Sequence, residues 1–313
     1  MFRIAIILGA ALLSIFYAPA PDPRILAAMR TAADASGSVL ADSPEEEFYC
    51  PMDPDVRVPE AGFCSRCGMR LIRGLRDVTP YPLHLDVQTP DAKRPELKRI
   101  AFEVRDPKTG DPTRDFELVH EKLYHLFVVS QDLSFFLHTH PERGRGEDFH
   151  LDIPFPKPGT YRLLSDFYPR GGGPQLVKNT VMVSSPGAVQ QQVVLRADLR
   201  PKQTENARVE LQTSQFRIAA GKKATLTFRV FPSEGLEPFL GAMAHTLAAS
   251  ADLIDMIHNH PFQALDEPGG QAKSLVFNSM LFPRPGIYRV WIQFQRRGVV
   301  NTASFDVPVS SSL

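Results

Sequence analysis

The stretch His125-Leu-Phe-Val-Val-Ser-Gln-Asp-Leu-Ser-Phe-Phe-Leu-His138-Thr-His140-Pro141 occurs a second time, as His245-Thr-Leu-Ala-Ala-Ser-Ala-Asp-Leu-Ile-Asp-Met-Ile-His258-Asn-His260-Pro261. Both copies have a histidine, then Ser-x-Asp-Leu, then His-x-His-Pro, at a constant interval of 120 residues. Further on, the run Pro156 to Tyr161 is echoed by the run Pro283 to Tyr288, now 127 residues later. The chain therefore contains a duplicated domain with a duplicated histidine trio.

Strand geometry predicts that the histidines of a trio meet. His138 and His140 follow an apolar run that is typical of a strand, and side chains in a strand repeat every two residues, so both project from one face. His125 opens a second apolar run, residues 126–129. Between the runs lies a turn sequence in which Asp132 can bond the backbone. Folding back at this turn brings His125 toward the pair.

Three converging neutral imidazoles suit Cu(II) or Zn(II). The candidate ligands are His125, His138 and His140 in the first repeat, and His245, His258 and His260 in the second. The alternative is a set of hydrogen-bonded turn histidines that hold a corner of the fold together. His150 occurs in the first repeat alone and is a weaker candidate, whereas His84 and His120 have no repeat partners and are interpreted as surface or core residues.

The pattern beyond residue 76 is β. Short apolar runs with turn residues between them predict seven or eight strands in each repeat. The predicted strands are Leu83–Gln88, Lys98–Arg105, Lys122–Val129, Phe135–His140, Phe149–Ile153, Thr160–Phe167 and Val177–Val183, then Val193–Leu199, Arg208–Thr213, Ala224–Val230, Ala244–Ala249, Ile254–His258, Ala272–Met280, Ile287–Phe294 and Val299–Val307. We expect a mostly β protein with two tandem immunoglobulin-like sandwiches, residues 76–188 and 189–313, preceded by a small metal-knuckle domain. Trp291 shares the strand parity of Ile287 and is expected in the core.

The N-terminus has the form of an export signal. Met1-Phe-Arg3 precedes an apolar run from Ile4 to Tyr17, too short to span a bilayer comfortably, and Ala18-Pro-Ala20 resembles a cleavage site. Pro21 disfavours cleavage there, so residues 1–20 are either a signal peptide or an N-terminal anchor, in which residues 4–20 hold the protein in the inner membrane. Residues 21–46 have no apolar periodicity and are expected to be a linker. We expect a periplasmic or extracellular protein.

All three cysteines fall in a short segment, residues 47–75. Its two motifs are Tyr49-Cys50-Pro-Met52-Asp53-Pro54 and Gly62-Phe-Cys64-Ser-Arg-Cys67-Gly68-Met69-Arg-Leu71. Thiolates spaced as in Cys64-x-x-Cys67 can hold one ion, and Gly68 permits the left-handed backbone that aims amides at sulfur. Met52 and Met69 add thioethers, which favour soft ions such as Cu(I). A disulfide or a redox pair are the alternatives.

These two motifs resemble the small heavy-metal-binding domain of bacterial metal-efflux ATPases and periplasmic efflux adaptors. The resemblance implies metal ligation by Cys50, Cys64 and Cys67, with Met52 and Met69 nearby. Asp53 stands where the family usually has histidine, and it suits zinc better than copper. The histidine stretch of the first repeat also resembles exported β-sandwich proteins found near copper and heavy-metal resistance functions.

Two classes of function remain open. The first is an exported protein that buffers, delivers or senses copper, zinc or a related ion, with a metal-efflux or metal-delivery protein as its partner. The second is a protein-interaction module in which metal only stabilises the fold; an accessory role in metal efflux is a narrower option. Lys plus Arg and Asp plus Glu each number 35, so nothing suggests nucleic acid. No nucleophile–base arrangement or phosphate loop stands out, and we expect no enzymatic activity.

Export is testable with a reporter. Alkaline phosphatase fused after residue 46 should be active, because that enzyme needs the oxidising space outside the cytoplasm. The same fusion without residues 1–20 is the control and should be inactive. Activity of a cytoplasmic reporter alone at this junction would contradict export.

Overall fold

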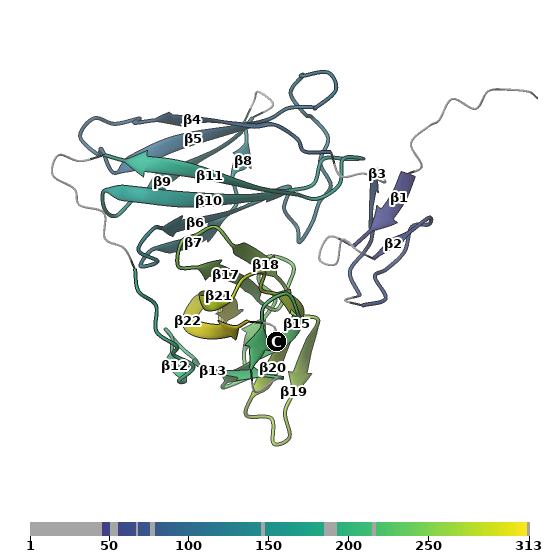
Figure 1. Cartoon of the computed structure of the whole chain (residues 1–313), viewed down its shortest axis with the longest axis vertical. Coiled ribbons are helices and arrows are strands. Elements are labelled where there is room, and N and C mark those ends of the chain that lie inside the picture. Colours follow the sequence, from purple (N-terminus) through teal and green to yellow (C-terminus); the bar gives the residue numbers. More distant parts are fainter. Residues whose placement is uncertain are drawn as a thin grey trace, which may run out of the picture. The chain divides into compact units, whose positions relative to one another are not determined.

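The computed structural model describes residues 46–50, 56–66, 68–75, 79–144, 148–184, 193–214 and 217–311, and all regular elements in these ranges are β-strands (Figure 1). The chain is mostly β, as the sequence predicts. Several sequence-based predictions lie outside the described residues. These are the signal peptide or anchor of residues 1–20, most of the linker 21–46, and the candidate ligands Met52, Asp53 and Cys67.

The cysteine segment forms a small antiparallel sheet. Its strands are β1 (Glu46–Tyr49), β2 (Arg57–Val58) and β3 (Ile72–Leu75), in the order β2-β1-β3. Cys50, Cys64 and Leu71 are buried together in its centre, with apolar side chains from β1 and β2 beside them. A second contact set joins this knuckle to the first sandwich, where Tyr49 and Ile72 pack with Val119 and Tyr168.

The first repeat is a two-layered sandwich. One sheet has the order β4-β5-β9-β8, with strands β4 (Leu83–Gln88), β5 (Leu97–Val104), β9 (Phe149–Pro154) and β8 (Glu142–Arg143). The other has the order β11-β10-β6-β7, with strands β11 (Gln175–Val183), β10 (Gly159–Phe167), β6 (Tyr124–Ser130) and β7 (Phe136–Thr139). This division of the strands between two antiparallel sheets is that of an immunoglobulin-like sandwich.

The second repeat has the same architecture. One sheet has the order β12-β13-β15-β20-β19, with strands β12 (Lys202–Gln203), β13 (Arg208–Thr213), β15 (Lys223–Phe231), β20 (Lys273–Leu281) and β19 (Gln263–Asp266). The other has the order β14-β22-β21-β17-β18, with strands β14 (Ile218–Ala219), β22 (Val299–Ser310), β21 (Gly286–Arg296), β17 (His245–Ser250) and β18 (Met256–Asn259). The short β16 (Leu236–Glu237) pairs with β21.

The strand predicted at Val193–Leu199 is wrong. This segment makes a single isolated bridge, Asp198 with Asp306, and is otherwise irregular. Its side chains alternate, since Val193 and Leu195 pack between the sandwiches while Val194 is 82% exposed, but that bridge is its only strand pairing among the described residues. The segment therefore serves as a connector, and the second sandwich begins with β12 and β13 instead.

Each sandwich has its own core, and a third apolar cluster lies between them. Strand β6 contributes to two of these clusters, since Leu126 and Val128 face the core of the first sandwich while Phe127 and Val129 face the second sandwich. We call this shared cluster the junction. It consists of Phe127, Val129, Leu133, Leu164, Leu195, Leu247, Ala249, Leu253, Met256 and Trp291.

Trp291 is buried, but not in the core of its own sandwich. It lies in the junction and stacks on Phe136 of the first sandwich, with ring centroids 5.0 Å apart. The parity with Ile287 is correct, because Ile287 packs against the same cluster. The face that carries both residues is covered by the other repeat.

Two equivalent turns meet at the edge of the junction. Bridges Val119–Lys122 and Phe239–Ala242 close these turns. At Gly241, which has φ +77°, an added Cβ would lie 3.0 Å from the Cα and carbonyl carbon of His120. The second turn therefore approaches the backbone of the first so closely that only glycine fits without a shift.

Two glycine substitutions test this close approach. Gly110 has nearly the same φ, +76°, but nothing lies within 4 Å of its Cβ position. Gly110→Ala should cost only the left-handed conformation, roughly 1–2 kcal/mol. Gly241→Ala should cost more, because the backbone of His120 must also move. Equal losses in urea unfolding would show that the turns are not in contact.

Candidate metal centre

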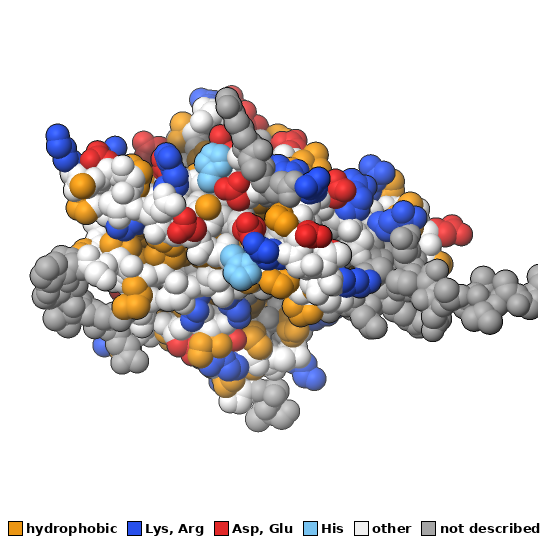
Figure 2. Space-filling view, turned by 90° about the horizontal axis from the view of Figure 1, so that it is seen from above, with side chains coloured by type: hydrophobic (Ala, Val, Ile, Leu, Met, Phe, Trp, Pro, Cys, Tyr) orange, Lys and Arg blue, Asp and Glu red, His pale blue; other side chains and the backbone are white. Residues whose placement is uncertain are grey.

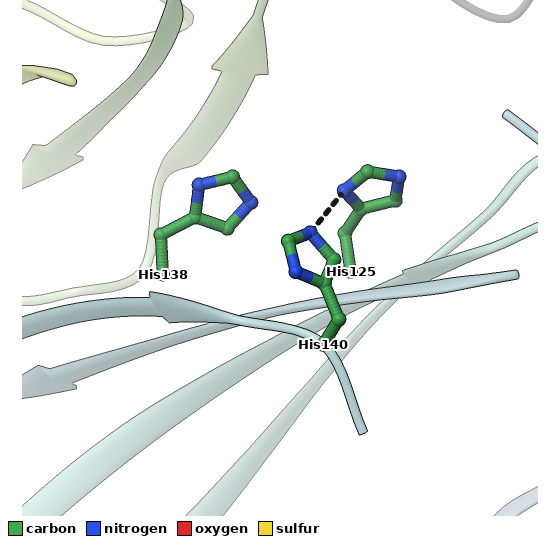
Figure 3. Close-up of side chains that lie close together, drawn as sticks. All are labelled: His125, His138 and His140. Atoms are coloured by element: carbon green, nitrogen blue, oxygen red, sulfur yellow. Dashed lines mark hydrogen bonds between the residues drawn. The ribbon is translucent and has the colours of Figure 1, made fainter. Parts of the chain in front are cut away.

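The first histidine trio is assembled by the hairpin of β6 and β7. The register pairs Phe127 with His138 and Leu126 with Thr139, so His125 and His140 lie opposite each other at the next position. The three rings project from the same side of the hairpin (Figure 3). One nitrogen of each ring lies within 4.8 Å of one nitrogen of both others. The predicted convergence of His125, His138 and His140 is what the structure shows.

The second trio is built in the same way by β17 and β18, where Leu247 pairs with His258. Its members, His245, His258 and His260, also have nitrogens within 4.8 Å of one another. Both hairpin turns use their Asp as the sequence predicts. Asp132 accepts hydrogen bonds from the Ser130 hydroxyl and the Ser134 amide, and Asp252 bonds its own turn likewise.

The two trios do not form one separate site per domain. They face each other across the junction, and the ring centroids of His138 and His245 are 4.9 Å apart. The reciprocal pair, His125 and His258, is 6.0 Å apart. Each trio lies on the sheet face that points away from its own core, and these two outer faces pack together. Sequence patterns show such a face but not what covers it.

A seventh histidine joins them. The ring of His120 lies 3.7 Å from that of His260, 6.0 Å from that of His245 and 6.4 Å from that of His125. Sequence analysis interprets His120 as a surface or core residue; the structure places it half-buried beside both trios. Comparing the repeats cannot find it, because Leu240 occupies the equivalent position in the second repeat.

We call this set of seven the histidine cluster. Its members are His120, His125, His138, His140, His245, His258 and His260. The other two placed histidines lie elsewhere, on the first-sandwich sheet that does not carry the trio: His84 is exposed on β4 and His150 is half-buried on β9. Figure 2 shows one face of the molecule, where acidic and basic side chains are interspersed and histidine is sparse.

The cluster is buried. His125 and His245 are each 1% exposed, His138 is 8% exposed, and the side chain of His258 is 3% exposed. His140 is half-buried.

Backbone carbonyls orient the first histidine of each trio. The Nε2 of His125 lies 2.9 Å from the carbonyl oxygen of Val119, and the Nε2 of His245 lies 2.8 Å from that of Phe239. A carbonyl only accepts, so Nε2 carries the proton and donates in both rings. The Nδ1 atoms then carry lone pairs. That of His125 accepts from His140 Nε2 at 3.2 Å, and that of His245 has no hydrogen-bond partner among the described residues.

The middle histidine of each trio is oriented by the opposite sandwich. His138 Nδ1 lies 3.2 Å from Gln293 Oε1, and His258 Nδ1 lies 2.8 Å from Asp166 Oδ2. Both acceptors leave the proton on Nδ1 and the lone pair on Nε2. In each ring that Nε2 is buried and has no hydrogen-bond partner among the described residues.

Asp166 and Gln293 occupy equivalent positions in the two repeats, and sequence analysis missed both. Asp166 pairs with His125 across β10 and β6, and Gln293 pairs with His245 across β21 and β17. The signal was available in principle, since the interval that relates Tyr161 to Tyr288 also relates these two residues. Their different side chains concealed it.

Burial keeps the cluster uncharged. Loss of hydration lowers the pKa of His125 to about 4 and the pKa values of His140 and His258 to about 3. The pKa values of His138, His245 and His260 are also well below the usual range, for the same reason and because other histidines lie nearby. Burial raises the pKa of Asp166, an effect that His125 opposes. Neutral imidazoles are the form that ligates metal.

The donor set fits a metal ion. Nitrogens bound to one tetrahedral zinc ion lie about 3.3 Å apart, given bond lengths of about 2.0–2.1 Å. Separations of up to 4.8 Å within each trio require only small ring movements. In metal-binding histidines, the ring nitrogen that does not bind the ion usually donates a hydrogen bond to a neighbouring group. Here a backbone carbonyl, an amide or a carboxylate accepts that bond.

The cysteine knuckle shows part of a thiolate site. Cys50 and Cys64 are buried, and neither is in a disulfide. The Arg66 amide donates to Cys64 Sγ at 3.3 Å, and Gly68 has φ +73°, so the predicted turn that aims an amide at sulfur is present. Met69 is half-buried beside a cavity of about 270 Å³. His120, Met243 and His260 line the same cavity.

The chain belongs to the family of a domain of unknown function, DUF8832, whose model matches residues 77–185 and again residues 202–311. A second family model, the heavy metal binding domain, matches residues 48–73 and confirms that part of the resemblance. A search of curated proteins gave no match. Among the described residues, no helix has the length and apolar character needed to cross a membrane.

Solved structures give distant similarities. FdeC, an Escherichia coli adhesin, is 11% identical with a TM-score of 0.23, and the alignment covers 78% of this chain and 70% of that one. A titin fragment is 12% identical with a TM-score of 0.20, and the alignment covers 74% of this chain and 100% of that one.

The lowered histidine pKa values predict acid sensitivity of the metal-free protein. Unfolded histidines take up protons near pH 6.5, whereas His125 and His258 stay neutral to about pH 4 and 3. The unfolded chain thus binds more protons in this window, and stability falls as the pH falls. Each extra proton adds a slope of about 1.4 kcal/mol per pH unit. Urea unfolding in the presence of a chelator, from pH 7 to 4.5, measures this dependence of the unfolding free energy on pH. An unfolding free energy that does not change over this range would contradict burial of the cluster.

Proposed function

We propose that this is an exported protein that binds copper, zinc or a related ion through its histidine cluster, and that buffers or delivers this ion. One observation carries the proposal. His138, His245 and His258 each have one ring nitrogen oriented by a hydrogen bond, and the other nitrogen is buried with no hydrogen-bond partner among the described residues.

The cost of such nitrogens favours a ligand over a structural role. A buried acceptor without a partner costs about 1–3 kcal/mol, and native proteins satisfy nearly all such groups. Histidines that merely held a corner of the fold would bond through both nitrogens or point one toward water. Here three lone pairs remain in one buried place, which is unfavourable unless an ion takes them.

The donor type narrows the ion. Neutral imidazole suits copper and zinc, while magnesium and calcium prefer oxygen. Asp166 is a carboxylate in contact with the cluster, but it bonds the protonated nitrogen of His258 and thus supports a ligand from outside. The cavity lined by His120 and His260 would give an ion a path into and out of the cluster.

The heavy metal binding domain supports the same function. Cys50 and Cys64 supply sulfur donors, and Met69 places a thioether at the cavity that reaches His260. A protein with a soft thiolate site next to an imidazole site is suited to take up an ion and pass it on. An efflux or delivery protein is the partner class that this role implies.

The second candidate function is a binding module stabilised by metal. The location of the cluster favours it, because ions held by both sandwiches would fix their junction. Exchange of the bound ion in the folded state distinguishes the two functions. A buffering or delivering protein should release the ion to a competing chelator in the folded state, whereas a structural ion should leave only on unfolding.

The test is metal content of the full chain. Wild-type protein loaded with Cu(II) or Zn(II) should lose the ions of the cluster in the double variant His138→Ala/His258→Ala, because each substitution removes a supported ligand. Ions held by the cysteine knuckle should remain, and Cys64→Ser should remove those instead. His84→Ala, an exposed histidine outside the cluster, is the matched control.

The opposite result is equally clear. If the histidines are structural, the double variant should keep the wild-type metal content while losing about 1–3 kcal/mol of stability for each broken buried hydrogen bond. Mass spectrometry of the metal content and urea unfolding of the same samples distinguish the two results.

A further inference from the structure

We infer that the histidine cluster is one dinuclear centre, which binds two ions of the copper or zinc class, one in each trio, across the junction of the sandwiches. This inference rests on the proposed function, since it concerns the number and coupling of the ions that the cluster binds.

The number of donors argues for two ions. Copper and zinc take about four ligands, of which three histidines are a common protein share. The cluster offers seven imidazoles, which is too many for one ion. Their nitrogens also group into two sets of three, each within 4.8 Å, rather than into one set of six.

The distance between the trios argues for one centre. The closest ring centroids between the two trios, those of His138 and His245, are as close as rings within a trio, at 4.9 Å against 5.0 Å for His138 and His140. Ring pairs His125–His245 and His138–His258 are 6.5 and 6.2 Å apart. Because the rings of the two trios are this close, ions bound in the two trios would be neighbours, as in two-metal sites.

Each sandwich orients the middle histidine of the trio on the opposite sandwich. Gln293, which belongs to the second sandwich, orients His138 of the first trio. Asp166, which belongs to the first sandwich, orients His258 of the second trio. Neither trio is therefore complete within its own repeat, and each needs the opposite sandwich to aim its middle histidine.

The support is unequal, and this predicts two unequal binding steps. Asp166 is a carboxylate, which strengthens the ligand that it orients, whereas Gln293 is a neutral amide whose own Nε2 donates to Thr302 at 3.1 Å. His120, beside His260, has no counterpart in the first trio, where Leu240 is the equivalent residue. Both differences favour the trio of His245, His258 and His260 as the first to fill.

Titration of the full chain with Cu(II), followed by metal analysis and electron paramagnetic resonance, tests the centre. Saturated wild-type protein should hold two more copper ions than His138→Ala/His258→Ala, which leaves the knuckle intact. The fully loaded cluster should show a spin-coupled spectrum. His138→Ala alone should restore the ordinary signal of an isolated Cu(II), and His84→Ala should match wild type.

Asp166→Ala tests the support across the junction as a positioning effect. The affinity of the first binding step should fall about 10–100-fold while the second changes little, as for loss of a group that orients a metal ligand. Asp152→Ala, an exposed carboxylate on β9, is the control and should leave both steps unchanged. A merely structural role of Asp166 would weaken both steps together.

Each outcome decides something. Two ions with coupled spectra support the dinuclear centre. One ion in the cluster at saturation, or two ions with independent spectra, overturns it while leaving metal binding intact. No ion in the cluster overturns the proposed function as well, so the two failures are distinguishable.

Discussion

The structure depends on two strands that are buried on both faces. In β6, Leu126 and Val128 face their own core while Phe127 and Val129 face the other repeat, and every residue of the strand is buried. Strand β17 is buried throughout in the same way. Because the three histidines of each hairpin share the outward face, packing these faces together takes six imidazoles largely out of water at once. Their neutrality, their fixed tautomers and their mutual proximity all follow from that contact.

Much of the fold and part of the site could be predicted from the sequence. The period of two in the apolar runs places strands β4 and β13 at the predicted bounds, and the repeated Ser-x-Asp-Leu turn correctly folds His125 back onto His138 and His140. These are local consequences of alternation and turn chemistry. The segment 193–199 fails because alternation does not say whether a run finds a partner strand, and this one makes a single bridge, from Asp198 to Asp306 of β22.

The junction could not be predicted in the same way. A period of two identifies two faces of a strand, but it does not say what covers the second one. The uninterrupted apolar run of residues 126–129 was a sign of burial on both sides, as in strands covered on two faces. Trp291, Asp166 and Gln293 acquire their roles only when the repeats face each other, and His120 has no echo in the second repeat that would draw attention to it.

The reciprocal contacts at the junction give the single chain the arrangement of a twofold homodimer. His138 hydrogen-bonds to Gln293 of the second repeat, and the equivalent His258 hydrogen-bonds to Asp166 of the first repeat. In a true homodimer every substitution is made twice, so both ends of such an interface must stay alike. Two halves on one chain can diverge. Asp166 opposite Gln293, and His120 opposite Leu240, are differences that a symmetric pair of chains has no means to encode.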